Sequence, residues 1–278
     1  RDAGGLQRIT NADVVIDATG TFGNSNWLGA GGVPAAGELA AREQSEYGLP
    51  DILGARREEY AGRHTLVVGN GYSAATNVVA LADLAAAAPG TNVTWITCGD
   101  SPGNDAEPIQ RIENDRLAAR DDLAGRANAL AGESDFVAHL PGALVEEIRV
   151  WNDPLRFAAT LSEGQTPSDS PLASGRTLEC DRVIANVGYR PDASLFEELQ
   201  VHQCYATGGP MKLAAALLGE SSADCLDQKS HGPQTLITSE PNFYILGSKS
   251  YGRNSNFLVS IGLVQIRELF SVIAGRQD

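Results

Sequence analysis

The sequence predicts an α/β protein of two domains, in which one domain is inserted into the other. A strand–helix–strand pattern occupies residues 64–97, and a short apolar strand ending at a glycine stands on either side of it, at 14–20 and 183–188. Short β-branched runs that alternate with helices and end at glycine turns are typical of parallel sheets. At 278 residues, the chain is long enough to form two hydrophobic cores.

The composition is that of an ordinary globular protein, with 42% apolar and 20% charged residues. The net charge of −14 repels polyphosphate backbones, so we expect no nucleic-acid partner. No run approaches the roughly 18 apolar residues of a membrane span, and no signal peptide is visible. We therefore expect a cytoplasmic protein with no membrane partner. The four cysteines form no C-x-x-C pair, which predicts neither a local redox dithiol nor a metal site.

The elements before residue 100 are expected as follows. Residues 14–16 form a buried strand that runs into a glycine turn, and residues 22–60 form a long connection of the kind that is functional or crosses between domains. Residues 64–68 and 92–97 are β-branched strands. The alanine-rich helix between them, 76–88, is stopped by Pro-Gly.

The elements after residue 98 are less regular. We expect a polar loop at 99–122, a helix at 121–130 and a hairpin with strands at 143–150 and 155–161. A turn-rich loop at 162–175 leads to a buried strand at 182–187. A mixed region at 193–242 is followed by a final strand at 243–246 and a final helix at 256–274.

The strongest motif is G-x-G-x-x-A, at Gly69, Gly71 and Ala74. The first glycine permits the tight turn out of the strand, the second lets the backbone approach a pyrophosphate, and the alanine keeps the helix close to the sheet. The helix N-terminus supplies unpaired N–H groups for phosphates. Because strand, turn, helix and second strand occur in this order, we expect a Rossmann-like dinucleotide site over Gly69, Asn70, Gly71, Tyr72, Ser73 and Ala74. The alternative is an ordinary tight strand–helix turn.

The end of the second strand bears on which nicotinamide cofactor binds. An acidic residue there would hold the ribose hydroxyls of NAD, but this position is Thr97 or Cys98, with Asp100 slightly beyond. The missing acid favours NADP, with NAD possible. Arg111 or Arg116 is a candidate partner for a 2′-phosphate, and the alternative is that both are solvated loop charges.

The glycine-ended strands on either side resemble a known family. Ala18-Thr19-Gly20 and the run from Val183 through Gly188 to Asp192 resemble the crossover segments of two-dinucleotide flavoproteins, which join an FAD domain to an inserted NAD(P) domain. Asn186-Val187 stands where Ala-Thr is usual in that family.

A third segment extends the resemblance. The sequence F-Y-I-L-G-S-K-S-Y-G before the last helix is similar to the late strand that brings Gly247 to FAD in these proteins, while the helix after it directs its positive end at the flavin. Ser248 replaces the usual Asp, which resembles the flavin-containing monooxygenase-like branch.

The resemblance implies three parts. Residues 1–58 are expected to be an FAD-domain segment with its linker, 59–184 the NAD(P) domain and 185–278 the return of the FAD domain. The FAD domain is of the three-layer ββα type and is expected to be incomplete, because no counterpart of the family's first G-x-G-x-x-G is present.

The resemblance also implies an activity. It is an FAD-dependent NAD(P)H oxidoreductase that passes a hydride to flavin and then electrons to oxygen or another acceptor, most similar to monooxygenases, with a small-molecule substrate and a possible homodimer. The alternatives are a disulfide reductase-like flavoprotein and a non-enzymatic nucleotide-binding or redox-sensing module. No acid or base is identified, since the four histidines are interpreted as structural or surface residues.

Overall fold

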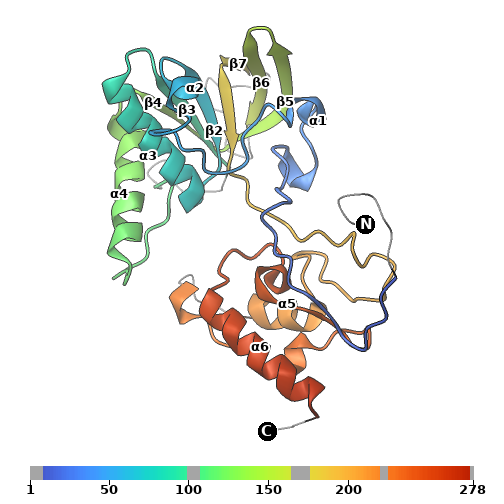
Figure 1. Ribbon diagram of the computed structural model, residues 1–278. Helices are drawn as coiled ribbons and strands as arrows, with labels where there is room; N and C mark the ends of the chain where they lie inside the picture. The colour runs from blue at the N-terminus through green and yellow to red at the C-terminus, as the bar shows by residue number, and fades with distance from the viewer. Residues whose placement is uncertain (1–8, 99–106, 164–175, 220–224, 276–278) are drawn as a thin grey trace. The chain divides into compact units, whose positions relative to one another are not determined.

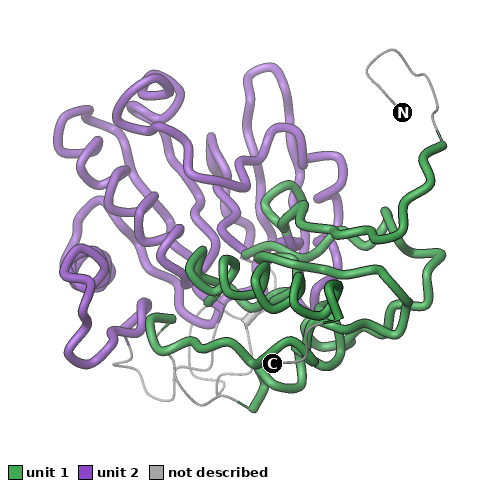
Figure 2. The backbone as a smooth tube through the Cα atoms, turned by 60° about the horizontal axis from the view of Figure 1, so that its bottom comes forward, with its two compact units in different colours: residues 1–25, 188–278 green, residues 26–187 purple. Residues whose placement is uncertain are grey.

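The computed structural model describes residues 9–98, 107–163, 176–219 and 225–275. The chain divides into two compact units (Figures 1 and 2): unit 1 is residues 1–25 with 188–278, and unit 2 is residues 26–187. The predicted α/β class, with a Rossmann-like domain inserted between two segments of another domain, is confirmed. Within the described ranges, no helix is long and apolar enough to cross a membrane.

The centre of unit 2 is a four-stranded parallel sheet. Its strands are β2 (His64–Val68), β3 (Asn92–Thr97), β4 (Val137–Pro141) and β8 (Arg182–Ala185), in the order β4-β3-β2-β8. The predicted strands 64–68 and 92–97 are confirmed to the residue. The predicted strand 182–187 ends two residues early, and β4 was missed.

Helices cover one face of this sheet. They are α3 (Tyr72–Ala87) and α4 (Ala118–Glu133), which begin four and three residues before the predicted starts at 76 and 121. Alternate strand residues such as Val67 and Trp95 pack against α3 in one core. Strands β2, β3 and β8 are buried on both faces, as in most parallel sheets, whereas the edge strand β4 is partly exposed.

A three-stranded antiparallel sheet lies on the other face of the parallel sheet. It consists of β5 (Ala143–Asn152), β6 (Leu155–Glu163) and β7 (Arg176–Cys180). Leu66 and Val68 of β2 share a second core with Ile148 and Phe157 from this sheet. The predicted hairpin is confirmed as β5–β6. Most of the predicted loop 162–175 lies outside the described residues, and its first two positions end β6.

Residues 26–58 belong to unit 2, whereas the sequence predicts them as part of the other domain. They contain η1 (Ala30–Gly32) and α1 (Glu38–Ala41), and α2 (Arg57–Tyr60) follows. Backbone bonds join the segment to β5: the Ala36 N–H donates to Glu146 O (2.8 Å), and the Ile148 N–H donates to Ala36 O (2.8 Å). Sequence composition carries no sign of such pairing, which explains the different boundary.

Unit 1 contains a two-stranded parallel sheet of β1 (Val15–Asp17) and β9 (Phe243–Ile245). Its helices are α5 (Met211–Leu218) and α6 (Val259–Ile273), with short 3-10 turns η2 (Cys225–Asp227), η3 (Pro233–Leu236) and η4 (Gly247–Tyr251). Leu213, Tyr244 and Leu269 belong to its main core. The predicted last strand is confirmed, and the last helix begins at 259 rather than 256. The strand predicted as buried at 14–16 lies at 15–17, and Val15 and Ile16 are exposed. The helix α5 lies within the region interpreted as mixed and was not predicted.

Candidate functional site

The topology of unit 2 defines where a ligand is expected. The chain leaves β2 through α3 to β3 on one side, and later returns as β8 on the other side of β2. The strand order therefore reverses between β2 and β8. In open α/β sheets, ligands bind beyond the carboxyl ends of the strands at such a switch point. Gly69 follows β2 and Asn186 follows β8, so the predicted glycine turn lies there.

Gly69 has to be glycine for a steric reason. Its φ is +140°, and a Cβ atom at this position would lie 2.3 Å from the carbonyl oxygen of Asn186. The turn is further fixed by the Gly69 N–H, which donates to Ile96 O (2.9 Å), and by the Trp95 indole, which donates to Gly69 O (2.8 Å). The first glycine of the motif therefore holds the turn against β8.

Gly71 has a different role, because a Cβ atom there would meet nothing within 4 Å. It is the N-cap residue of the sixteen-residue helix α3, and no side chain caps the helix. The first amides of the helix remain available to an anion, and the helix dipole favours negative charge there. Ala74 is fully buried and Ser73 is exposed. This open, uncapped cradle fits a pyrophosphate.

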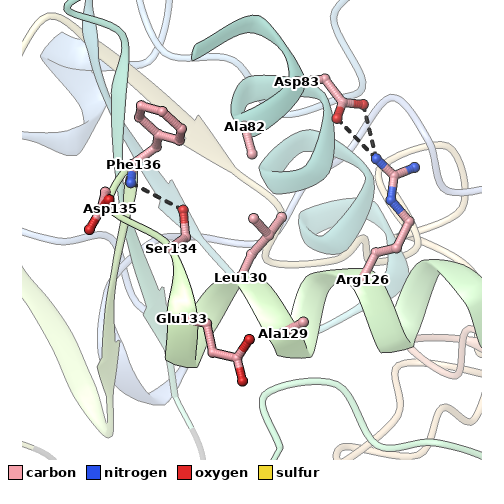
Figure 3. A pocket seen from close by; sticks show the side chains of 9 residues that line it. All are labelled: Ala82, Asp83, Arg126, Ala129, Leu130, Glu133, Ser134, Asp135 and Phe136. Atoms are coloured by element: carbon pink, nitrogen blue, oxygen red, sulfur yellow. Dashed lines mark hydrogen bonds and ion pairs between the residues drawn. The ribbon is translucent and has the colours of Figure 1, made fainter. Parts of the chain in front are cut away.

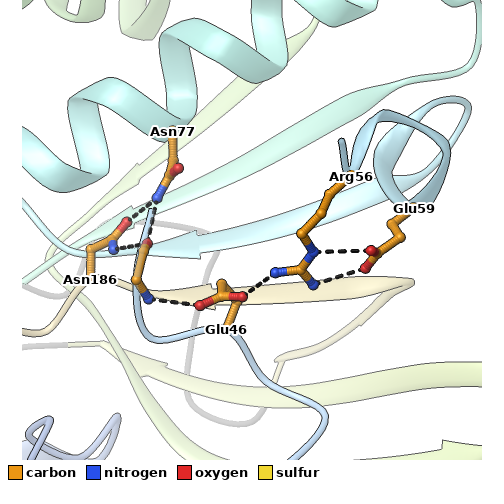
Figure 4. A network of polar contacts seen from close by, with 6 residues as sticks. Glu46, Arg56, Glu59, Asn77 and Asn186 are labelled. Atoms are coloured by element: carbon orange, nitrogen blue, oxygen red, sulfur yellow. Dashed lines mark hydrogen bonds and ion pairs between the residues drawn. The ribbon is translucent and has the colours of Figure 1, made fainter. Parts of the chain in front are cut away.

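Asn186 joins an amide network beside the turn (Figure 4). Its Oδ1 accepts from Asn77 Nδ2 (2.8 Å), and Gly48 O accepts from Nδ2 of both Asn77 (3.1 Å) and Asn186 (3.0 Å). Asn77 lies on α3 and is 1% exposed. Asn186 thus ties β8, α3 and residue 48 together, a role that no motif in the sequence predicts.

The network continues into the segment before β2. The Glu46 backbone extends the edge of β8, accepting from Ala185 N (2.7 Å) and donating to Val183 O (2.9 Å). Its carboxylate accepts from Gly48 N (3.0 Å) and pairs with Arg56. Arg56 also makes a two-point contact with Glu59, at 3.0 and 2.8 Å. These ions are partly exposed, so they contribute more to geometry than to stability.

At the end of β3, where the sequence predicts recognition of the ribose, Thr97 and Cys98 are hydrogen-bonded to other residues of the chain. Thr97 is buried, and its Oγ1 lies 2.9 Å from His139 Nε2. Cys98 is exposed, and its carbonyl oxygen accepts from Asn70 Nδ2 at 3.3 Å. Asp100 and its neighbours lie outside the described residues. Of the two predicted ribose contacts, only Cys98 is open to solvent.

The arginines proposed for a 2′-phosphate do not support that role. Arg111 makes a two-point ion pair with Asp121, at 2.9 and 2.7 Å, which holds the guanidinium against the start of α4. Arg116 is exposed and also has an interaction within the protein. The preference for NADP therefore rests only on the absence of an acid at the end of β3.

Two histidines of the parallel sheet are held neutral. His64 Nδ1 lies 2.9 Å from Glu179 O, which can only accept, so Nδ1 carries the proton and Nε2 accepts from Thr94 Oγ1 (2.9 Å). Burial lowers the pKa of His64 and of His139. Both are structural residues, as predicted from the sequence.

This arrangement predicts a pH dependence of stability. The unfolded histidines bind protons below about pH 6.5 while the folded ones do not, so stability present above that pH is lost as the pH falls. From pH 7 to 5, the free energy of unfolding should decrease by roughly 1 kcal/mol more in the wild type than in a His64→Gln/His139→Gln variant, since both rings are only half-buried. Urea unfolding at several pH values measures this. Identical pH dependence in the two proteins would contradict it.

In unit 1, the structure brings two predicted segments together. β1 and β9 are parallel, with Asp17 opposite Ile245, so Ala18-Thr19-Gly20 and Gly247-Ser248 follow neighbouring strands. Gly20 (φ +76°) and Gly247 (φ +71°) are both left-handed, and a Cβ on Gly20 would lie 3.4 Å from Ser248 Oγ. A Cβ on Gly247 would meet nothing. Two adjacent glycine turns fit a second dinucleotide.

Gly188 is not part of this pair of turns. It has φ +79° and precedes Tyr189, which forms an antiparallel bridge with Ser25. The Arg190 N–H donates to Asn24 O (2.9 Å). The second crossover segment of unit 1 therefore pairs with the chain a few residues beyond Gly20.

A buried ion pair that no motif in the sequence predicts lies beneath the two turns. Lys249 Nζ is 2.6 Å from Asp17 Oδ2, and the two side chains are 2% and 0% exposed. Burial raises the pKa of Asp17, but hydrogen bonds from Lys249 and Thr19 outweigh it, so the net pKa is lowered. The only signal in the sequence was an Asp inside an apolar strand.

The cysteines show no dithiol. Cys98, Cys180, Cys204 and Cys225 are all free thiols. Burial raises the pKa of Cys180 to about 12, whereas backbone and side-chain hydrogen bonds from Thr207 lower that of Cys204. In the described part of the chain, no group of His, Cys, Asp and Glu could hold a metal ion.

A surface hollow of about 500 Å³ lies between α3 and α4 (Figure 3). Phe136, which directly precedes β4, lines it, so the hollow lies toward the amino ends of the parallel strands, whereas the glycine turn follows the carboxyl end of β2. The ion pair of Arg126 with Asp83 (3.0 and 3.1 Å) spans the hollow. Three of its side chains are acidic, which disfavours an anionic dinucleotide. Its lining residues are Ala82, Asp83, Arg126, Ala129, Leu130, Glu133, Ser134, Asp135 and Phe136.

Solved structures share this fold. Bacillithiol disulfide reductase from Bacillus cereus aligns with 96% of the chain at 20% identity and a TM-score of 0.60, and thioredoxin reductase from T. acidophilum aligns with 95% at 17% and 0.57. Thioredoxin reductase from Lactococcus lactis aligns with 95% at 12% and 0.51. The chain spans 63%, 67% and 66% of their lengths. No family model and no curated protein matches the sequence.

The chain therefore has the fold of these reductases, which is the fold class that its motifs predicted. All three structures carry the name of a reductase acting on a disulfide or on thioredoxin. None of these names supports the monooxygenase-like interpretation, which rested on Ser248 replacing an Asp.

Proposed function

We propose that this chain is, or is part of, an NAD(P)H-dependent flavoprotein oxidoreductase. The observation that carries the proposal is the glycine turn at the switch point of unit 2, where Gly69 is fixed by sterics and Gly71 leaves an open cradle over an uncapped helix N-terminus. NADPH or NADH would bind there. The end of β3 carries no acid, so we expect NADPH to be preferred, while the choice between the two stays a prediction.

The FAD would be held in unit 1. Residues 18–20 and 247–248 offer two left-handed glycine turns side by side. Beneath them, Asp17, Thr19 and Lys249 are hydrogen-bonded to one another. The two cofactors, when bound, supply hydride transfer and the reduction of an acceptor. The residues of the chain bind and orient them. We name no catalytic acid or base.

A disulfide is the acceptor that we propose, in the balanced reaction NADPH + H⁺ + RSSR → NADP⁺ + 2 RSH. The names of the structural neighbours favour it over oxygen. Cystine, a small-molecule disulfide, is the acceptor used in the test below. The predicted homodimer and cytoplasmic location stay predictions.

The first test is a visible spectrum of the purified chain, followed by anaerobic addition of NADPH. We expect a bound-flavin spectrum that bleaches, and then recovers on addition of cystine, with two thiols formed per NADPH oxidised. Recovery with oxygen but not with cystine would contradict the proposed acceptor. Binding of NADPH to a protein that takes up no FAD would favour a nucleotide-binding module.

A further inference from the structure

The ion pair of Asp17 and Lys249 occupies a special place in unit 1. Asp17 is the last residue of β1, and Lys249 lies in η4, two residues after the Gly247 turn that follows β9. Lys249 Nζ donates to Asp17 Oδ2 (2.6 Å) and to Thr19 Oγ1 (3.0 Å), and lies 5.2 Å from the centre of the Phe196 ring. The Lys249 ammonium group is thus held by a carboxylate, a hydroxyl and an aromatic ring of unit 1.

Stability alone does not explain such a pair. Removing two charges from water is costly, and apolar residues of similar volume often give equal or greater stability. What the pair adds is a defined geometry at the ends of two strands. The other oxygen of Asp17 accepts from Thr19 N (3.1 Å) and Thr19 Oγ1 (2.7 Å), which directs the backbone into Gly20.

The Gly247 turn is held by a second contact. The Gly247 N–H donates to Gln265 Oε1 (2.9 Å), and Gln265 Nε2 donates to Ser250 Oγ (2.9 Å). Gln265 is 2% exposed, on α6. Gln265 therefore ties the second turn to a helix, and Lys249 ties it to the first turn. In this assembly, Lys249 is the side chain that connects the two turns.

We propose that Lys249 is a positioning residue for a dinucleotide in unit 1: through Asp17 and Thr19 it holds the Gly20 and Gly247 turns at the separation that FAD requires. The inference rests on the proposed function for the identity of the ligand. Lys249 is 2% exposed, so it acts through the turns and not by touching the ligand.

The test compares four proteins: the wild type, Lys249→Met, Asp17→Asn/Lys249→Met, and Lys212→Met as a matched control at an exposed lysine of unit 1. The single variant leaves Asp17 buried without its partner, so its melting temperature should drop sharply. The double variant removes both charges and should melt close to the wild type. We expect it to bind FAD at least tenfold more weakly, with NADPH affinity unchanged.

Hydrogen exchange without FAD gives a second readout. Peptides covering residues 13–22 and 243–252 should exchange faster in the double variant than in the wild type, while peptides of unit 2 should not change. A folded double variant with wild-type FAD affinity and wild-type exchange would overturn the proposal and make the pair an ordinary core feature. If the wild type itself takes up no FAD, the proposed function fails, and the exchange comparison alone decides whether Lys249 holds the turns.

Discussion

Gly69→Ala should lower stability and Gly71→Ala should not, although both replace a glycine of the same motif. Alanine at 69 requires φ +140° and places Cβ 2.3 Å from a backbone carbonyl, so β2 and β8 must move apart. We expect the free energy of unfolding to fall by about 3 kcal/mol or more. Alanine at 71 has room and an extended backbone, so stability should stay within about 1 kcal/mol of the wild type.

Nucleotide binding separates the two variants further. A methyl group at 71 occupies the cradle that we assign to the pyrophosphate, and Gly71→Ala should weaken NADPH binding at least tenfold. Urea unfolding and titration calorimetry on the same preparations measure both quantities. A stable Gly71→Ala protein with wild-type NADPH affinity would place the nucleotide elsewhere, and a stable Gly69→Ala protein would show that the turn is not as constrained as described.

Glu38→Ala should strongly destabilise residues 26–58. The Glu38 side chain is fully buried, and its carboxylate accepts from Leu28 N, Ala35 N and Tyr47 Oη, each at 2.8 Å. Removing it leaves three donors without their acceptor, two of them backbone groups. Charge-assisted bonds contribute about 1.5–3 kcal/mol each and are not additive, so we expect a loss of about 3–5 kcal/mol.

Glu43→Ala is the matched control, because Glu43 lies five residues further on and is exposed. It should change the free energy of unfolding by less than about 0.5 kcal/mol. Chemical denaturation of both variants measures the difference. Protease sensitivity should rise first within residues 26–47 of the Glu38 variant. Equal stability of the two variants would show that the segment is not anchored by this carboxylate.

The parts of the fold that were predicted correctly are those fixed by local chemistry. β2 and β3 are β-branched runs bounded by a glycine turn or by a Pro-Gly stop, and the G-x-G-x-x-A motif requires its turn wherever it occurs. By contrast, β4 reads V-A-H-L-P, which has one β-branched residue, and it becomes a strand because β3 offers it an edge. The helix α5, with Leu213 and Leu217 one turn apart and Pro210 before it, could have been recognised.

The site was predicted only in part, for a similar reason. The glycine positions follow from backbone geometry, which a sequence shows directly. The partners of Asn186 and Lys249 are 109 and 232 residues away in the chain, at Asn77 and Asp17. No local pattern reports such contacts. Asn186 and Ser248 depart from the pattern of two-dinucleotide flavoproteins, but these departures do not reveal which residues contact them.

The ends of unit 2 meet, since Asn26 Nδ2 donates to Val187 O at 3.0 Å. This has a consequence for the order of events during synthesis. All of unit 2 leaves the ribosome as one continuous stretch with adjoining ends, so it can fold as soon as residue 187 emerges. Asp17 must wait for Lys249, 232 residues later. We therefore expect unit 2 to fold first, while β1 of unit 1 stays unpaired until residues 243–249 have been synthesised.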